Sequence, residues 1–242
     1  MNNDLHTLLS ANSDPLLPGF CAVEDALQKI SQDGGQARGA VFTRREVVEF
    51  ILNLVGYTVD QPLYQRSILE PSFGKGDFLL VAVERLFESW KRHNRPVSVL
   101  NFASCVRAVE LHHDTFKSTR NKLINQLKTE GVSDIDINTL TNQWLVHGDF
   151  LLSELPAEFE FVVGNPPYVR QELIPDILIA KYRSIYTTIF DRSDLYIPFI
   201  ERSVRQISSK GKVGIICANR WTKNRYGGPL RQLLSEKYHL HI

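Results

Sequence analysis

An apolar run that stops at two consecutive prolines constrains this chain more than any other feature. Residues 161–168 read Phe-Val-Val-Gly-Asn-Pro-Pro-Tyr. Proline has no amide hydrogen and a fixed φ, and it pushes the residue before it toward extended backbone, so a strand has to end here in a stiff turn. Open α/β sheets bind their ligands beyond the carboxyl ends of their strands. The turn therefore predicts a site that presents the Asn165 side chain, the Pro166 carbonyl and the Tyr168 ring.

These three groups suit one kind of ligand. An amide oxygen and a carbonyl oxygen can each accept a hydrogen bond from an exocyclic NH2, and an aromatic ring can stack on the plane that carries it. The pattern thus favours a site that grips a planar base and holds it for group transfer. From these residues alone, a proline-terminated strand followed by an ordinary loop is the alternative.

Three more apolar segments end in a carboxylate. Residues 68–70 end in Glu and lead into the glycine turn 72–78, which lets a ligand approach the backbone at a helix N-terminus. This turn matches neither G-x-G-x-x-G nor the P-loop. Residues 104–110 also end in Glu, which can accept hydrogen bonds from both ribose hydroxyls. Residues 144–150 end in Gly-Asp-Phe, a carboxylate beside an aromatic ring that fits an adenine. Each acid alone is compatible with a cap or a surface charge, but the set favours a nucleoside site.

The alternation of strand and helix patterns predicts an α/β protein with a doubly wound, mostly parallel sheet. Strands are expected near residues 67–69, 105–109, 144–147, 161–163, 213–217 and 238–242. Helices are expected near residues 22–31, 43–55, 77–93, 114–128, 194–208 and 229–237. Thr43 and Glu46 form a T-x-x-E pattern, which predicts a capping box at the start of the second helix. Residues 170–192 read as a helix plus a mobile loop.

Composition is compatible with this reading. The 242 residues are 43% hydrophobic and 23% charged, enough for one sizeable core. The sequence has no apolar run of about 18 residues and no signal-peptide pattern, which argues against a membrane or secreted protein and predicts a cytoplasmic one. The cysteines lack C-x-x-C spacing, and His112 and His113 lack partners at metal spacing, so no metal is expected. A net charge of +1 neither favours nor excludes nucleic acid.

From about Ala37 onward the chain resembles the S-adenosylmethionine-dependent DNA methyltransferases that methylate the exocyclic amine of adenine. The likeness is strongest to those of type II restriction–modification systems. Beyond the motifs above, it is carried by residues 42–48, 193–199, 211–221 and 229–231. The resemblance implies a class I, Rossmann-like fold, S-adenosyl-L-methionine as cofactor and double-stranded DNA as substrate. It also implies a possible cognate restriction endonuclease as partner.

The resemblance also assigns residues. Cofactor contacts are implied for Val41, Thr43, Glu70, Ser72, Phe73, Gly74, Gly76, Glu110, Leu111, Asp149, Phe150 and Phe199. Catalytic roles are implied for Asn165, Pro166, Pro167 and Tyr168. Basic residues that are candidates for DNA contact, and equally for solvated surface charge, are Arg170, Arg192, Arg220, Lys223 and Arg225.

The expected organisation is a leader at residues 1–38 with one helix, followed by a catalytic domain at 39–242. Relative to the family, that domain is expected to lack its final strands and a downstream target-recognition domain. Two other functions stay open. Protein glutamine methyltransferases share Asn-Pro-Pro-Tyr, although their cofactor turn more often follows an aspartate in a D-x-G-x-G run. The chain is also compatible with a cofactor-binding fragment that does not turn over.

Overall fold

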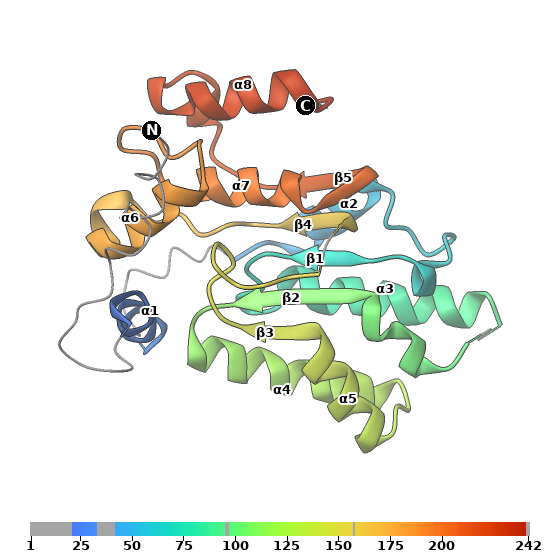
Figure 1. Cartoon of the computed structure of the whole chain (residues 1–242). Coiled ribbons are helices and arrows are strands. Elements are labelled where there is room, and N and C mark those ends of the chain that lie inside the picture. Colours follow the sequence, from blue (N-terminus) through green and yellow to red (C-terminus); the bar gives the residue numbers. More distant parts are fainter. Residues whose placement is uncertain (1–20, 33–41, 95–96, 157, 241–242) are drawn as a thin grey trace, which may run out of the picture.

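A parallel β-sheet forms the centre of the protein. The computed structural model describes residues 21–32, 42–94, 97–156 and 158–240. The sheet has five strands in the order β3-β2-β1-β4-β5, and every pairing is parallel (Figure 1). The strands are β1 (Ile68–Glu70), β2 (Val106–Glu110), β3 (Leu145–His147), β4 (Phe159–Gly164) and β5 (Ile207–Ile215). The strand order reverses between β1 and β4, which confirms the predicted doubly wound α/β fold.

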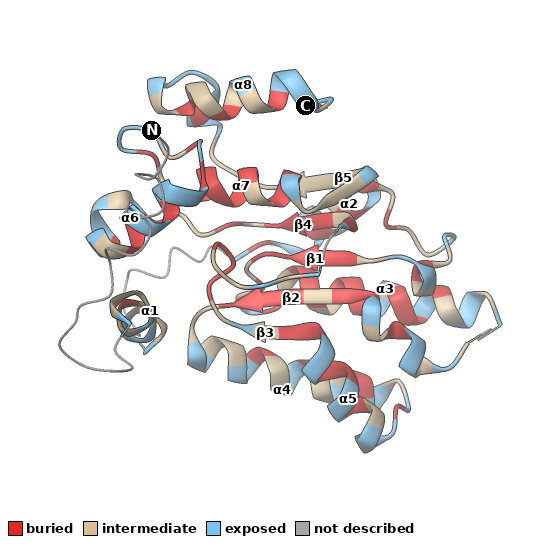
Figure 2. Cartoon of the chain, in the orientation of Figure 1, coloured by how far each residue is buried: buried red, intermediate tan, exposed pale blue. Residues whose placement is uncertain are grey.

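Helices cover both faces of the sheet. They are α1 (Ala22–Gln32), α2 (Arg45–Val55), α3 (Asp77–Arg92), α4 (His113–Thr129), α5 (Asp134–Trp144), α6 (Asp176–Ile185), α7 (Tyr196–Arg205) and α8 (Gly228–Lys237). Side chains of α2 to α5 share one hydrophobic cluster, and those of α1, α6 and α7 share a second. Figure 2 shows the resulting burial along the strands β1, β2 and β4.

The central strands β1 and β4 are apolar just before their carboxyl ends because both of their faces are buried there. Successive side chains of a strand point to opposite faces, so neighbouring residues enter different clusters. Ile68 and Val163 belong to the cluster of α2 to α5, whereas Leu69 and Val162 belong to the cluster of α1, α6 and α7. This alternation explains why the run before Asn165 has no polar face.

The predicted capping box is wrong. Helix α2 begins at Arg45, and its N-cap residue Arg44 makes no side-chain cap hydrogen bond. The Thr43 hydroxyl instead accepts a hydrogen bond from the Asn165 side chain, with an N–O distance of 3.2 Å. A tertiary contact has therefore taken the oxygen that the local pattern assigned to the helix terminus.

Two predicted elements near the C-terminus also differ. The predicted helix 194–208 ends earlier, at Arg205, because the next residue already pairs with β4: Phe159 N donates to Gln206 O at 2.6 Å. Residues 238–240, the described part of the last predicted strand, form no strand. Tyr238 there is held by its own contacts, since its hydroxyl donates to Val204 O at 2.9 Å.

Helix α5 was not predicted, although its signal is present. Ile137, Leu140 and Trp144 are buried at helical spacing, and the Ser133 hydroxyl caps the helix by accepting from Asp136 N at 3.2 Å. Helix α1 confirms the helix that was expected in the leader. Among the helices in the described ranges, none combines the length and apolarity needed to cross a membrane.

Candidate active site

A cavity of about 300 Å³ lies at the carboxyl edge of the sheet, between the loops that follow β1 to β4. Of the predicted cofactor residues, it is lined by Ser72, Gly74, Glu110, Leu111, Asp149, Phe150 and Phe199. The predicted catalytic loop reaches the same cavity through Pro167. Thr43, Glu70, Phe73 and Gly76 do not line it, and Val41 falls outside the described residues.

The glycine turn after β1 leaves one wall of the cavity open to the backbone. Gly74 has a φ of +48°, and a Cβ added there would meet no atom within 4 Å, so a ligand can approach its main chain closely. Gly76 also has a positive φ, but a Cβ there would come within 2.8 Å of Thr119 Cγ2. Gly76 therefore serves the packing of the turn against α4, and not the cavity.

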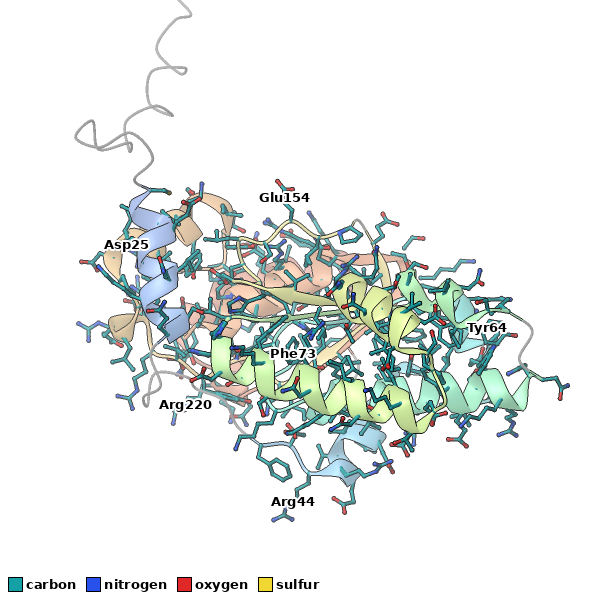
Figure 3. The ribbon with its side chains drawn as sticks, turned by 90° about the horizontal axis from the view of Figure 1, so that it is seen from below. Asp25, Arg44, Tyr64, Phe73, Glu154 and Arg220 are labelled. Carbon is teal, nitrogen blue, oxygen red and sulfur yellow. The ribbon has the colours of Figure 1, made fainter. Side chains whose placement is uncertain are left out.

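Phe73 supports this turn from within the core. It is 2% exposed, and its ring centroid lies 5.7 Å from that of Phe116. Its backbone amide donates to Val109 O at 2.9 Å, which ties the turn to β2. Figure 3 shows Phe73 inside the fold, whereas Arg44 lies at the periphery. The structure thus places Phe73 behind the site.

Glu110, at the end of β2, holds the glycine turn against its own strand. One carboxylate oxygen accepts from Gly74 N at 2.9 Å, and the other accepts from His112 N at 2.8 Å. Each oxygen of a carboxylate has two acceptor sites, so these bonds orient the group while each occupies only one acceptor site of its oxygen. Because Glu110 also lines the cavity, an oriented acceptor faces any ligand bound there.

Glu70, at the end of β1, is a buried carboxyl group beneath the turn. It is 5% exposed, and its Oε2 atom has no hydrogen-bond partner among the residues described. Burial raises the pKa of Glu70 well above its ordinary value, and the negative charges of Asp77 and Glu110 raise it further. The site therefore concentrates acceptor groups close to the end of β1.

Asp149, which follows β3, is the third carboxylate. Its Oδ1 accepts from Leu151 N at 2.9 Å, and its Oδ2 accepts from the Tyr182 hydroxyl at 2.6 Å. Burial raises the pKa of Asp149, while these two bonds and the nearby Arg202 guanidinium oppose the rise. Tyr182 also lines the cavity, and it was missed as a site residue because it lies within the mixed segment 170–192.

Two aromatic rings stand beside Asp149. The centroids of Phe150 and Phe199 are 5.1 Å apart, with a 44° angle between the rings. The Arg202 guanidinium lies 5.0 Å from the Phe150 centroid. Helix α7 thus brings Phe199 against Phe150, the residue that follows Asp149.

The proline-rich loop after β4 is held by contacts from two directions. The Asn165 amide donates to Thr43 Oγ1, and Thr43 N in turn donates to Asp77 Oδ2 at 2.7 Å. The Tyr168 hydroxyl donates to Ile216 O at 3.3 Å, and burial raises its pKa. The loop is therefore tied both to the first turn of α3 and to the end of β5.

Helix α1 also contributes to the cavity, through Lys29 and Ile30. It is tethered there by Ser31, whose hydroxyl donates to Leu111 O at 2.7 Å. Nothing in the sequence of this helix distinguished it from a surface helix. The predicted DNA-contacting residues, Arg170, Arg192, Arg220, Lys223 and Arg225, are all exposed.

Comparison with known proteins identifies the family. The model of the Eco57I restriction-modification methylase family matches residues 52–242. The type II methyltransferase M.PaeR7I of Pseudomonas aeruginosa is 54% identical over 231 residues, which cover 94% of this chain and 40% of the relative. The chain therefore spans about 40% of the length of this curated relative.

Solved structures agree on the fold. A methyltransferase subunit of a type I restriction-modification system from Streptococcus thermophilus has a TM-score of 0.55 at 17% identity, over 88% of this chain and 42% of that one. A nuclease-deletion mutant of the enzyme LlaGI, in complex with a DNA substrate mimic, has a TM-score of 0.57 at 19% identity, over 83% and 22%. The fold is that of class I S-adenosylmethionine-dependent methyltransferases. With the family model matching most of its length, this chain belongs to the Eco57I restriction-modification methylase family.

Proposed function

We propose that this chain is the cofactor-binding and catalytic part of a restriction–modification methyltransferase that methylates the exocyclic amine of adenine in double-stranded DNA. The family and the relatives named as type II methyltransferases support methyl transfer. The observation that carries the proposal is the shared cavity: Glu110, Asp149 and Phe199 line it together with Pro167 of the Asn-Pro-Pro-Tyr loop. A nucleoside cofactor and a gripped base would meet at that boundary.

The residues present fit S-adenosyl-L-methionine. Glu110 offers an oriented acceptor for ribose hydroxyls, and Asp149 with Phe199 offers an acceptor and a ring face for adenine. The open side of Gly74 allows the methionine part to approach the backbone. Glu70 does not line the cavity and would support the glycine turn from beneath. When bound, the cofactor supplies an electrophilic methyl group on a sulfonium.

The loop after β4 would contribute by positioning the amine of the target base. The Asn165 side-chain oxygen and the Pro166 carbonyl would accept from the two amine hydrogens and so direct the nitrogen lone pair, while Tyr168 would stack on the base. Alignment of reacting groups can contribute about 7–11 kcal/mol in favourable cases. Thr43 supports this geometry because it holds the Asn165 amide nitrogen.

A DNA substrate requires that the target base leave the duplex, since its amine is otherwise inside the helix. The restriction-modification family favours DNA over a protein glutamine side chain, which the same loop would also suit. The solved complex of LlaGI with a DNA substrate mimic gives the fold a precedent for contact with DNA. Site recognition and a cognate endonuclease are part of the proposal for the full-length protein.

The test separates cofactor binding from transfer. Calorimetry should show binding of S-adenosylmethionine to the chain, and Glu110→Ala should weaken it by about tenfold or more, the worth of a hydrogen bond to a charged group. Glu236→Ala, at an exposed glutamate of α8, is the matched control. Equal affinity of Glu110→Ala and the parent would overturn the ribose assignment.

Transfer is measured with labelled cofactor and duplexes that contain or lack adenine. Label should enter only the adenine-containing duplex, as N6-methyladenine after digestion. Asn165→Ala should lower kcat far more than cofactor affinity, because its hydrogen bond acts on the reacting amine. Label on cytosine, or on protein glutamine offered in place of DNA, would refute the proposed substrate.

A further inference from the structure

The hydroxyl of Tyr182 makes the shortest hydrogen bond to the Asp149 carboxylate. Tyr182 lies on α6, is 3% exposed and donates to Asp149 Oδ2 at 2.6 Å. The two residues are 33 apart in sequence and both line the cavity. Burial and the adjacent carboxylate raise the pKa of Tyr182, so its hydroxyl keeps the proton that it donates.

This bond fixes what Asp149 can offer to a ligand. Leu151 N holds Oδ1 and Tyr182 holds Oδ2, so the plane of the carboxylate is set from both sides. Each oxygen retains a second acceptor site. Both bonds also favour the ionised form of Asp149 against its burial. Because a donor faces each of its oxygens, the oriented carboxylate presents acceptor sites to a ligand.

We infer that Tyr182 is a positioning residue that makes the cavity selective for a purine with an exocyclic amine over one with an oxo group at the same ring position. The inference rests on the proposed binding of an adenosyl cofactor in this cavity. A 6-amino group donates to the Asp149 carboxylate, whereas a 6-oxo group would turn a lone pair toward it. Without the Tyr182 hydroxyl, Asp149 loses its orientation and its ionised form loses a donor, so it discriminates less between the two rings.

The position of α6 gives a matched control. Tyr186 lies one turn after Tyr182, is also buried, and donates its hydroxyl to Leu151 O at 2.5 Å. Tyr186→Phe removes a buried hydroxyl from the residue that caps the end of α6 and leaves both hydrogen bonds to the Asp149 carboxylate in place. A loss of packing or stability in α6 would affect Tyr182→Phe and Tyr186→Phe alike. A loss of selectivity would affect only Tyr182→Phe.

The experiment measures the affinity of the chain for S-adenosylhomocysteine and for its 6-oxo analogue, S-inosylhomocysteine, by calorimetry. The parent should prefer the amine. Tyr182→Phe should reduce the ratio of the two affinities about tenfold, the size of one hydrogen bond to a charged group. Tyr186→Phe should leave the ratio within about twofold, and Asp149→Asn, which can donate to an oxo group, should reverse the preference.

The outcomes distinguish this inference from the proposed function. If the parent binds and prefers S-adenosylhomocysteine but Tyr182→Phe keeps the full ratio, the role of Tyr182 is refuted and the cofactor assignment stands. If both tyrosine variants lose affinity for both ligands equally, Tyr182 is only part of the packing of α6, and the inference fails. If the parent binds neither ligand, the adenosyl cavity itself is refuted, together with everything that rests on it.

Discussion

Glu70→Gln should make the unliganded protein more stable at neutral pH. The Glu70 carboxyl group is 5% exposed, with an Oε2 atom that has no partner among the described residues, and the charges of Asp77 and Glu110 lie nearby. Burying an ionised carboxylate without a partner costs more than burying a neutral polar group. Glutamine keeps the shape and a polar atom at this place but removes the charge beside Asp77 and Glu110, so we expect the free energy of unfolding to rise by about 1–3 kcal/mol at pH 7.

The gain should depend on pH, with a sign that follows from the raised pKa of Glu70. The folded protein binds this proton more tightly than the unfolded chain, whose glutamate pKa is about 4.3. The contribution of Glu70 to stability is therefore fully present below that value, and it is lost as the pH rises through the folded-state pKa. The stability difference between Glu70→Gln and the parent should be small near pH 4 and should grow toward neutral pH. Other titrating groups are common to both proteins and cancel in the difference.

Urea unfolding of both proteins at a series of pH values measures this difference, provided that the m-value is unchanged. Glu110→Gln is the control, and its change in the free energy of unfolding should have the opposite sign. Both oxygens of Glu110 accept from backbone amides, and a glutamine can replace only one of these acceptors, so it should destabilise the protein by about 1–3 kcal/mol. A Glu70→Gln protein that is less stable than the parent at pH 7, or a difference that does not vary with pH, would refute the reasoning.

Three further predictions test the turn, the loop and the core. Gly74→Ala and Gly131→Ala should each lower the free energy of unfolding, measured in urea, by about 1–2 kcal/mol, because both glycines have a positive φ. Both have open space at Cβ, but only Gly74 lines the cavity, so only Gly74→Ala should weaken cofactor binding. Thr43→Val should lower the single-turnover rate of methyl transfer about fivefold, because it removes a hydrogen bond to Asn165 that contributes about 1 kcal/mol. An unchanged rate with weaker cofactor binding would place Thr43 at the cofactor instead. Glu201→Ala should destabilise the fold by about 3–5 kcal/mol, because its fully buried carboxylate pairs with Arg205 and accepts from amides and hydroxyls of the α6–α7 connection. A loss below about 1 kcal/mol would contradict this.

The strand ends were predictable because their chemistry is local. Asn165 to Tyr168 and the glycine turn stop their strands through backbone constraints that act within a few residues. Acids at the ends of β1 and β2 reach the same edge once the strands are parallel, so Glu70 and Glu110 could be placed near each other from sequence alone. The class of the fold followed from the alternation of strand and helix patterns.

The contacts that organise the site were not predictable in this way. Thr43 fits a capping box by its local pattern, yet its oxygen is taken by a side chain 122 residues later. Tyr182 carries no motif, and its role depends on how α6 lies over β3 and the loop after it. Such pairings are decided by the packing of whole elements, which overrides local propensity.

The glycine turn follows β1 and the Asn-Pro-Pro-Tyr loop follows β4, so only long-range contacts can fix the two loops relative to each other. The two strands are neighbours at the point where the strand order reverses, so the glycine turn of one and the Asn-Pro-Pro-Tyr loop of the other leave the same edge of the sheet. Nothing in either strand sets the distance between those loops. The hydrogen bonds from Asn165 to Thr43 and from Thr43 to Asp77 connect the Asn-Pro-Pro-Tyr loop to the first residue of α3, where the glycine turn enters that helix. The glycine turn and the Asn-Pro-Pro-Tyr loop therefore share one frame, which the proposed methyl transfer between two bound groups would require.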